Sequence, residues 1–135
     1  MTSPAEVPIT SNDDVVRVRQ VVRGLAAEVK MSLVDQTKVV TAASELARNT
    51  FVYGGGGTAT VELVTNPATG RTGVKIVFTD EGPGIPDVDL ALTEGWSSGS
   101  GLGLGLSGTR RLVDEFDLET EPGTGTRISV TKWTR

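Results

Sequence analysis

The sequence predicts an α+β fold, a two-layer α/β sandwich in which helices pack against a sheet. Two observations predict it. Hydrophobic residues recur with a helical period in the first third of the chain, and they alternate with polar residues in the segments that follow. The chain has 135 residues, enough for one domain with its own core. We therefore expect a single domain over residues 1–135, since neither an internal repeat nor a second domain is visible.

The helices come first. Residues 7–10 (VPIT) are compatible with a short strand, and Ser11 to Asp14 then supply capping chemistry and early acidic residues. The apolar spacing that follows predicts a helix over residues 12–30. A second helix is expected from Val34 to Tyr53, because Gly54 to Gly57 end it.

Strands occupy most of the remaining chain. Residues 58–65 and 72–79 alternate between apolar and polar positions around the turn sequence NPATG, so they predict a hairpin. Four further segments follow: short helices at 87–94 and 109–116, and the strands of a second hairpin at 117–121 and 126–133.

Composition restricts the chemistry. The formal net charge of −4 argues against general electrostatic binding of nucleic acid or of an anionic membrane. Because the chain has neither cysteine nor histidine, disulfides, thiolate or histidine metal ligands and histidine acid–base catalysis are excluded. No apolar run is long enough to span a membrane, and the first residues lack a signal-peptide layout, so a cytoplasmic location is expected.

The first candidate site is ELARN, residues 45–49, in the second predicted helix. Glu45 and Asn49 are four residues apart and share one helix face beside Arg48, whereas Leu46 and Ala47 belong to the buried side. Two interpretations stay open: a solvated polar face, or a carboxylate base next to an amide oxygen that coordinates Mg²⁺.

The second candidate site is TDEGPGIP, residues 79–86, which follows an apolar strand. Asp80 either forms the turn or accepts a hydrogen bond from an exocyclic amine such as that of adenine. Gly82 and Gly84 would let the backbone approach a flat ligand closely, and Ile85 would add an apolar wall.

The third candidate site is SSGSGLGLGLSG, residues 97–108. It contains a literal GxGxxG that begins at Gly103, but the match does not follow a core strand in a βαβ unit. The phosphate-binding sequence Gly-Lys-Ser/Thr is absent, and a flexible linker does not explain the interleaved leucines. A loop that leads into a helix N-terminus and binds phosphate fits these residues best.

In this order, ELARN, DEGPGIPD and GLGLGL resemble the N, G1 and G2 boxes of the Bergerat-fold (GHKL) ATPases and kinases. The short lid at about residues 94–106, GTRRLVDEF and the terminal TKW are similar to the RsbT-type serine/threonine switch kinases of the stressosome, which are anti-sigma regulatory factor kinases. Asn49-Thr50-Phe51 departs from the Asn-Ala and histidine of their anti-sigma relatives. The resemblance implies helices on one face of a mixed, mostly antiparallel sheet.

The resemblance also implies a role for individual residues. Glu45 would be the general base, Asn49 would hold Mg²⁺, Asp80 would bind the adenine amine and Thr126 would join a water network at adenine. The remaining nucleotide contacts would come from two loops: Gly82, Gly84, Ile85, Gly101, Leu102, Gly103, Leu104 and Gly105. For Arg111, as for the arginine of ELARN, phosphate neutralisation and a surface salt bridge both stay open.

These roles imply a serine/threonine protein kinase that depends on ATP and Mg²⁺. Its substrates would be STAS-domain proteins, the stressosome scaffold and antagonist, and it would also activate a PP2C-type phosphatase. The alternative is an anti-sigma factor that sequesters a sigma factor in a nucleotide-dependent way. An ATPase clamp would need a transducer domain, and a histidine kinase core would need a phosphoacceptor histidine.

Overall fold

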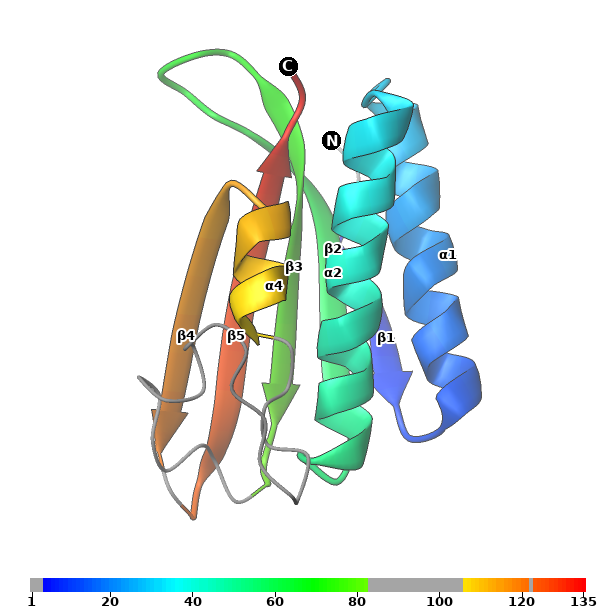
Figure 1. Cartoon of the computed structure of the whole chain (residues 1–135), viewed down its shortest axis with the longest axis vertical. Helices are drawn as coiled ribbons and strands as arrows, with labels where there is room; N and C mark the ends of the chain where they lie inside the picture. The colour runs from blue at the N-terminus through cyan, green and yellow to red at the C-terminus, as the bar shows by residue number, and fades with distance from the viewer. Residues whose placement is uncertain (1–3, 83–105, 122) are drawn as a thin grey trace.

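In the computed structural model of the chain, the described residues form three helices that lie on one face of a five-stranded sheet (Figure 1). The structure describes residues 4–82, 106–121 and 123–135. The strand order is β1-β2-β3-β5-β4, and every pairing within the described part is antiparallel. The predicted α+β sandwich is confirmed, and the expected mixed sheet is antiparallel in all of these pairings.

The first strand and helix form the outer edge of the molecule. β1 (Ala5–Ile9) pairs with β2 (Gly57–Thr65), and α1 (Asn12–Glu28) follows it directly. The carboxylate of Asp14 accepts hydrogen bonds from the backbone N–H and the hydroxyl of Thr10, at 2.8 and 3.0 Å. The bond from the backbone N–H is the main reason that the pKa of Asp14 lies below its ordinary value. Ser11, the N-cap residue, forms no capping hydrogen bond with its side chain, so the predicted capping chemistry is present only in the acceptor role of Asp14.

The second helix lies across the middle of the sheet and contributes many buried apolar side chains to the core. α2 (Leu33–Val52) begins where the Ser32 side chain accepts a hydrogen bond from the Asp35 backbone N–H at 3.1 Å. It ends where the carbonyl of Asn49 accepts hydrogen bonds from the N–H groups of Tyr53 and Gly54. The predicted span therefore agrees with the structure to within about one residue at each end.

The two predicted hairpins are present. β2 pairs with β3 (Thr72–Asp80) over its whole length, and β4 (Glu115–Glu121) pairs with β5 (Gly125–Trp133). β3 and β5 are neighbours in the centre of the sheet, so the two hairpins form one continuous layer. This pairing brings the end of β3 beside the start of β5.

The predicted helix over residues 109–116 is wrong at both ends. α4 (Leu106–Leu112) starts earlier and stops four residues sooner, and Phe116 belongs to β4. The backbone N–H of Asp114 bonds to the Thr131 carbonyl at 2.9 Å, and Phe116 then pairs with Val130. Pairing with β5 therefore overrides the local helical pattern.

The core lies between the helices and the sheet. Its largest fully buried apolar side chains come from both layers: Ile9, Val18, Val22, Val39, Leu46, Val61, Val74, Ile76, Phe78, Leu106 and Val130. None of the described helices is long and apolar enough to cross a membrane.

Buried charges lie at the end of the molecule where β5 finishes and α2 begins. Lys132 is 3% exposed, and its Nζ lies 3.8 Å from carboxylate oxygens of both Asp35 and Asp114. Arg135 completes the group, with its Nε 3.3 Å from Asp35 and an outer nitrogen 3.5 Å from Asp114. These ion pairs connect α2, the α4–β4 turn and the last residues of the chain.

Candidate active site

Asp80 lies at the end of β3, between two neighbouring strands. Its register partners are Gly57 of β2 and Thr126 of β5. Because side chains alternate along a strand, Asp80 shares its face with the buried Phe78, two residues earlier. The carboxylate Oδ1 accepts a hydrogen bond from the backbone N–H of Gly82 at 2.9 Å. The sheet thus presents Asp80 on the side covered by the helices, at the edge of the core.

The carboxyl group of Asp80 is partly desolvated. Burial raises the pKa of Asp80 above its ordinary value of 3.8, although hydrogen bonds from the backbone N–H groups of Gly82 and Thr126 act in the opposite direction. A further N–H donor would stabilise the charged form and offset the burial. The local chemistry therefore suits a ligand that donates a hydrogen bond, as an exocyclic amine does.

Three glycines allow the backbone to come close to Asp80. A Cβ on Gly54 would lie 2.5 Å from the Asp80 Cγ, and a Cβ on Gly82 would lie 2.7 Å from the carbonyl oxygen of Gly54. Gly125 has a φ of +140°, and a Cβ there would collide with the Asp80 carbonyl oxygen. The helix end, the β3 turn and the start of β5 therefore meet around one carboxylate.

Sequence reasoning missed the contact that Gly54 makes. It assigned Gly54 to Gly57 only to the end of the second helix. One signal was available, because four consecutive glycines are more than a helix stop needs. In the structure, these glycines also line a hollow of about 390 Å³ beside Asp80.

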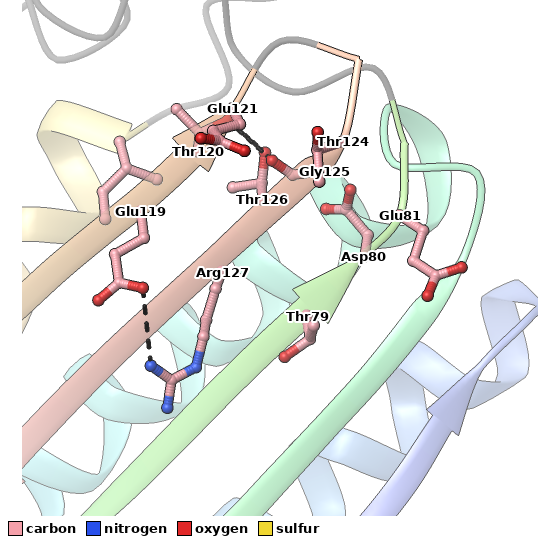
Figure 2. Close-up of a pocket in the computed structure, with 11 residues that line it drawn as sticks. Thr79, Asp80, Glu81, Glu119, Thr120, Glu121, Thr124, Gly125, Thr126 and Arg127 are labelled. Carbon is pink, nitrogen blue, oxygen red and sulfur yellow. Dashed lines mark hydrogen bonds and ion pairs between the residues drawn. The ribbon is translucent and has the colours of Figure 1, made fainter.

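A larger hollow of about 730 Å³, wide open to solvent, lies on the other side of Asp80. Figure 2 shows that its walls come from the end of β3 and from the β4–β5 hairpin. The hydroxyls of Thr126 and Thr120 are 3.0 Å apart, and the Thr120 hydroxyl also donates to the Gly125 carbonyl at 3.0 Å. Thr126, selected from the sequence, is therefore beside Asp80, and Thr120 is an additional polar group that the sequence did not single out.

The ELARN segment has the predicted orientation on α2. Leu46 and Ala47 are buried, Asn49 is half-buried, and Glu45 and Arg48 are exposed. The two candidate polar residues therefore lie on the side of the helix that the core leaves open.

The backbone of Asn49 connects to the Asp80 site. Its carbonyl accepts a hydrogen bond at 3.2 Å from the N–H of Gly54, which packs against Asp80. Glu45 lies one turn further from that end of α2, and it lines a separate groove between α1 and α2. The structure thus groups Asp80, Gly82 and Thr126, and it places Asn49 and Glu45 on one helix that ends at this group.

The remaining predicted site residues divide into two sets. Arg111 is exposed on α4, as Arg48 is on α2. The others lie outside the described residues: Gly84, Ile85, Gly101, Leu102, Gly103, Leu104 and Gly105, together with the expected helix at 87–94.

A metal ion at this site would need oxygen ligands from water or substrate phosphates in addition to those from the protein. Within residues 4–82, 106–121 and 123–135, no group of three or more acidic, histidine or cysteine side chains could hold a metal. Mg²⁺ commonly keeps several waters and shares the oxygens of substrate phosphates with one or two protein groups. A single amide such as that of Asn49 fits Mg²⁺ only in that shared form.

Comparisons with known proteins identify the family. Residues 34–134 match the model of the histidine kinase-, DNA gyrase B-, and HSP90-like ATPases. The chain is 43% identical over 135 residues to the serine/threonine-protein kinase RsbT of Bacillus subtilis (strain 168), and the match covers 100% of each chain. It is 26% identical over 118 residues to an anti-sigma F factor of Thermoanaerobacter sp. (strain X514), covering 85% of this chain and 82% of that relative.

A solved structure shares the fold. It contains the RsbU and RsbW domains of a Mycobacterium tuberculosis protein, and it aligns with a TM-score of 0.63 and 19% identity. The alignment covers 99% of this chain and 33% of that longer chain. The chain therefore belongs to the histidine kinase-, DNA gyrase B- and HSP90-like ATPase family, and within it to the serine/threonine-protein kinases similar to RsbT.

Proposed function

We propose that this serine/threonine protein kinase transfers the γ-phosphoryl group of ATP, with Mg²⁺, to STAS-domain proteins of a stressosome in the cytoplasm. The substrates would be its scaffold and antagonist proteins. The observation that carries the proposal is the partly desolvated carboxylate of Asp80, which lies beside an open hollow of about 730 Å³ at the end of the sheet. A half-buried carboxylate acceptor next to glycine backbone suits a flat base that carries an amine.

The residues around Asp80 would hold the base. Asp80 would accept a hydrogen bond from the adenine amine, and Gly54, Gly82 and Gly125 would let the surrounding backbone pack directly against Asp80. The hydroxyl of Thr126 would take part in the water network at adenine. From the sequence, we propose that Gly84 and Ile85 complete this wall.

The phosphates would lie toward the end of α2. Asn49 would hold Mg²⁺, which when bound neutralises phosphate charge and orients the phosphoryl group. We propose from the sequence that the residues of the lid, Gly101, Leu102, Gly103, Leu104 and Gly105, wrap the phosphates with their backbone N–H groups.

Glu45 would act on the substrate hydroxyl. Its carboxylate is exposed on the same helix face as Asn49, so it is open to a protein substrate. As the hydroxyl oxygen bonds to the γ-phosphorus, the bond from that phosphorus to the bridging oxygen of ADP breaks. Glu45 would take the hydroxyl proton. Positioning and charge neutralisation supply most of the catalysis in phosphoryl transfer.

The test is transfer of label from ATP to a STAS-domain protein encoded in the same genome. We expect label on a serine or threonine only when Mg²⁺ is present. A wild-type protein that binds ATP normally and transfers no label to any such partner would contradict the kinase proposal. Activation of a PP2C-type phosphatase, the second role that we propose, is measured separately by adding this protein to the phosphatase.

A second candidate function is a nucleotide-dependent anti-sigma factor, favoured by the 26% identity to an anti-sigma F factor. The two functions differ in their partner. A pull-down in the presence of ATP that retains a sigma factor and no STAS-domain protein would favour this alternative.

A further inference from the structure

A third hollow among the described residues lies between α1 and α2, and its lining has a regular pattern. Arg19 and Arg23, four residues apart, contribute one stripe from α1. Leu33, Thr37 and Glu45 belong to a stripe at intervals of four residues along α2, and small side chains leave a groove of about 460 Å³ between the helices.

The arginines of this groove have no partner within the described part of the chain. Arg19 and Arg23 are exposed, and neither forms a hydrogen bond or ion pair with a described residue. Arg17, on the same helix, differs because its guanidinium pairs with Asp14 at 3.3 Å. These two arginines outnumber the one carboxylate that lines the groove, Glu45, so the groove is a local site for negative charge in a chain of net charge −4.

The end of the groove away from Glu45 carries one exposed apolar side chain. Leu33 lines the groove there and is 77% exposed, at the first turn of α2. Glu45 lies twelve positions after Leu33 in α2, which corresponds to about 18 Å of helix. An extended peptide of roughly five or six residues spans this length.

We propose that this groove docks an acidic segment of the protein substrate. Carboxylates of the segment would pair with Arg19 and Arg23, an apolar side chain would cover Leu33, and the phosphoacceptor hydroxyl would then lie near Glu45. This inference rests on the proposed function, because it identifies how the phosphoacceptor protein reaches the base. It adds a surface that selects the partner by charge and plays no part in nucleotide binding.

The test is a steady-state phosphorylation assay with the STAS-domain substrate that the wild type phosphorylates. The variant Arg19→Glu/Arg23→Glu replaces two attractive charges by two repulsive ones. We expect kcat/KM for the protein substrate to fall roughly tenfold or more, mainly through KM. The Kd for ATP should stay unchanged. High salt should raise the KM of the wild type more than that of the variant.

Arg71→Glu is the control, because Arg71 is exposed in the turn between β2 and β3 and carries the same type of charge reversal, at one site, outside the groove. It should leave kcat/KM unchanged. The single variants Arg19→Glu and Arg23→Glu match its charge change, and each should lower kcat/KM. An equal loss for Arg71→Glu, or no loss for the double variant, would overturn the docking proposal. A change in the oligomeric state of the double variant by light scattering would also overturn it, since the groove would then hold a second copy.

Failure of the docking proposal is distinguishable from failure of the kinase proposal. If the wild type labels no STAS-domain protein, the proposed function fails. If the wild type labels the substrate and the double variant does so with the same KM, only the docking site fails. Circular dichroism of each variant establishes that the fold is intact.

Discussion

At the scale of single residues, the proposed nucleotide site depends on Asp80 and on the groups that surround it. Its position at the end of an apolar strand was predictable, since the sequence shows the strand and the turn that follows. The contact with Gly54 was not predictable, because it depends on how α2 meets β3 in three dimensions. Glu45 and Asn49 were predictable as a pair from their spacing alone, and their place relative to the substrate is still a prediction.

Replacing Asp80 by asparagine should abolish most nucleotide binding. The amide would keep a hydrogen-bond acceptor for Gly82 but would lose the charge that holds an amine. A hydrogen bond to a charged group contributes about 1.5–3 kcal/mol, so ATP affinity should fall roughly tenfold to a hundredfold. Titration calorimetry measures it, with Asp117→Asn on the exposed side of β4 as the control. Equal affinities for Asp80→Asn and the wild type would contradict the adenine assignment.

The same substitution should stabilise the protein without nucleotide at neutral pH. Burial raises the pKa of Asp80 in the folded state, so the folded protein binds the proton more readily than the unfolded chain. The stability of the wild type therefore falls as pH rises from the ordinary value of 3.8 through the raised pKa. Thermal unfolding should give a higher Tm for Asp80→Asn at pH 7, and the difference should shrink below pH 3.8. A lower Tm at pH 7 would contradict this.

Replacing Gly54 by alanine should weaken ATP binding by displacing the Asp80 carboxylate, with Asp80 itself left in the sequence. The new Cβ would lie 2.5 Å from the Asp80 Cγ and would displace it. Overpacking of this kind typically costs about 1–3 kcal/mol of stability. Gly24→Ala in α1 is the matched control, because a Cβ there meets nothing within 4 Å, and it should be neutral or slightly stabilising. Unchanged affinity and stability for Gly54→Ala would refute the steric argument.

At the scale of elements, the helices and hairpins with strong periodicity were predictable, and the segment around Phe116 was not. Its helical pattern continues past Leu112, but hydrogen bonds to β5 begin at Asp114. Long-range pairing decides such a boundary, and local sequence carries little information about it. The ion pairs that join α2, the α4–β4 turn and the C-terminal residues have the same origin, because Asp35 and Lys132 are far apart in the chain.

Replacing Lys132 by methionine should destabilise the fold strongly. The buried carboxylate of Asp35 would lose one of its two cations, and removing a partner from a buried pair costs about 3–5 kcal/mol. The cost should lie near the lower end, because Arg135 still contacts Asp35. Arg135→Met should cost less than about 1 kcal/mol, since its side chain is 64% exposed. Chemical denaturation measures both, and equal losses would contradict a burial-dependent role.

At the scale of the whole molecule, the buried ion pairs and the candidate nucleotide site lie at opposite ends of the fold. The buried ion pairs lie where β5 ends, whereas Asp80, Thr126 and the last turn of α2 lie at the opposite end of the same elements (Figure 1). The fold class and the family were predictable from three motifs in order. The groove between α1 and α2 was not, because it depends on the packing of two helices whose outer residues look like ordinary solvated positions.

In the mechanism that we propose, this fold positions a protein hydroxyl and the Glu45 carboxylate at an ATP γ-phosphate. The most direct measurement is the single-turnover rate of phosphate transfer to the STAS-domain substrate by the wild type and by Glu45→Ala, at saturating ATP and Mg²⁺. Glu28→Ala, at the exposed end of α1, serves as the control. We predict a loss of about a hundredfold or more for Glu45→Ala, with ATP affinity unchanged. Transfer by Glu45→Ala at the wild-type rate would contradict the account.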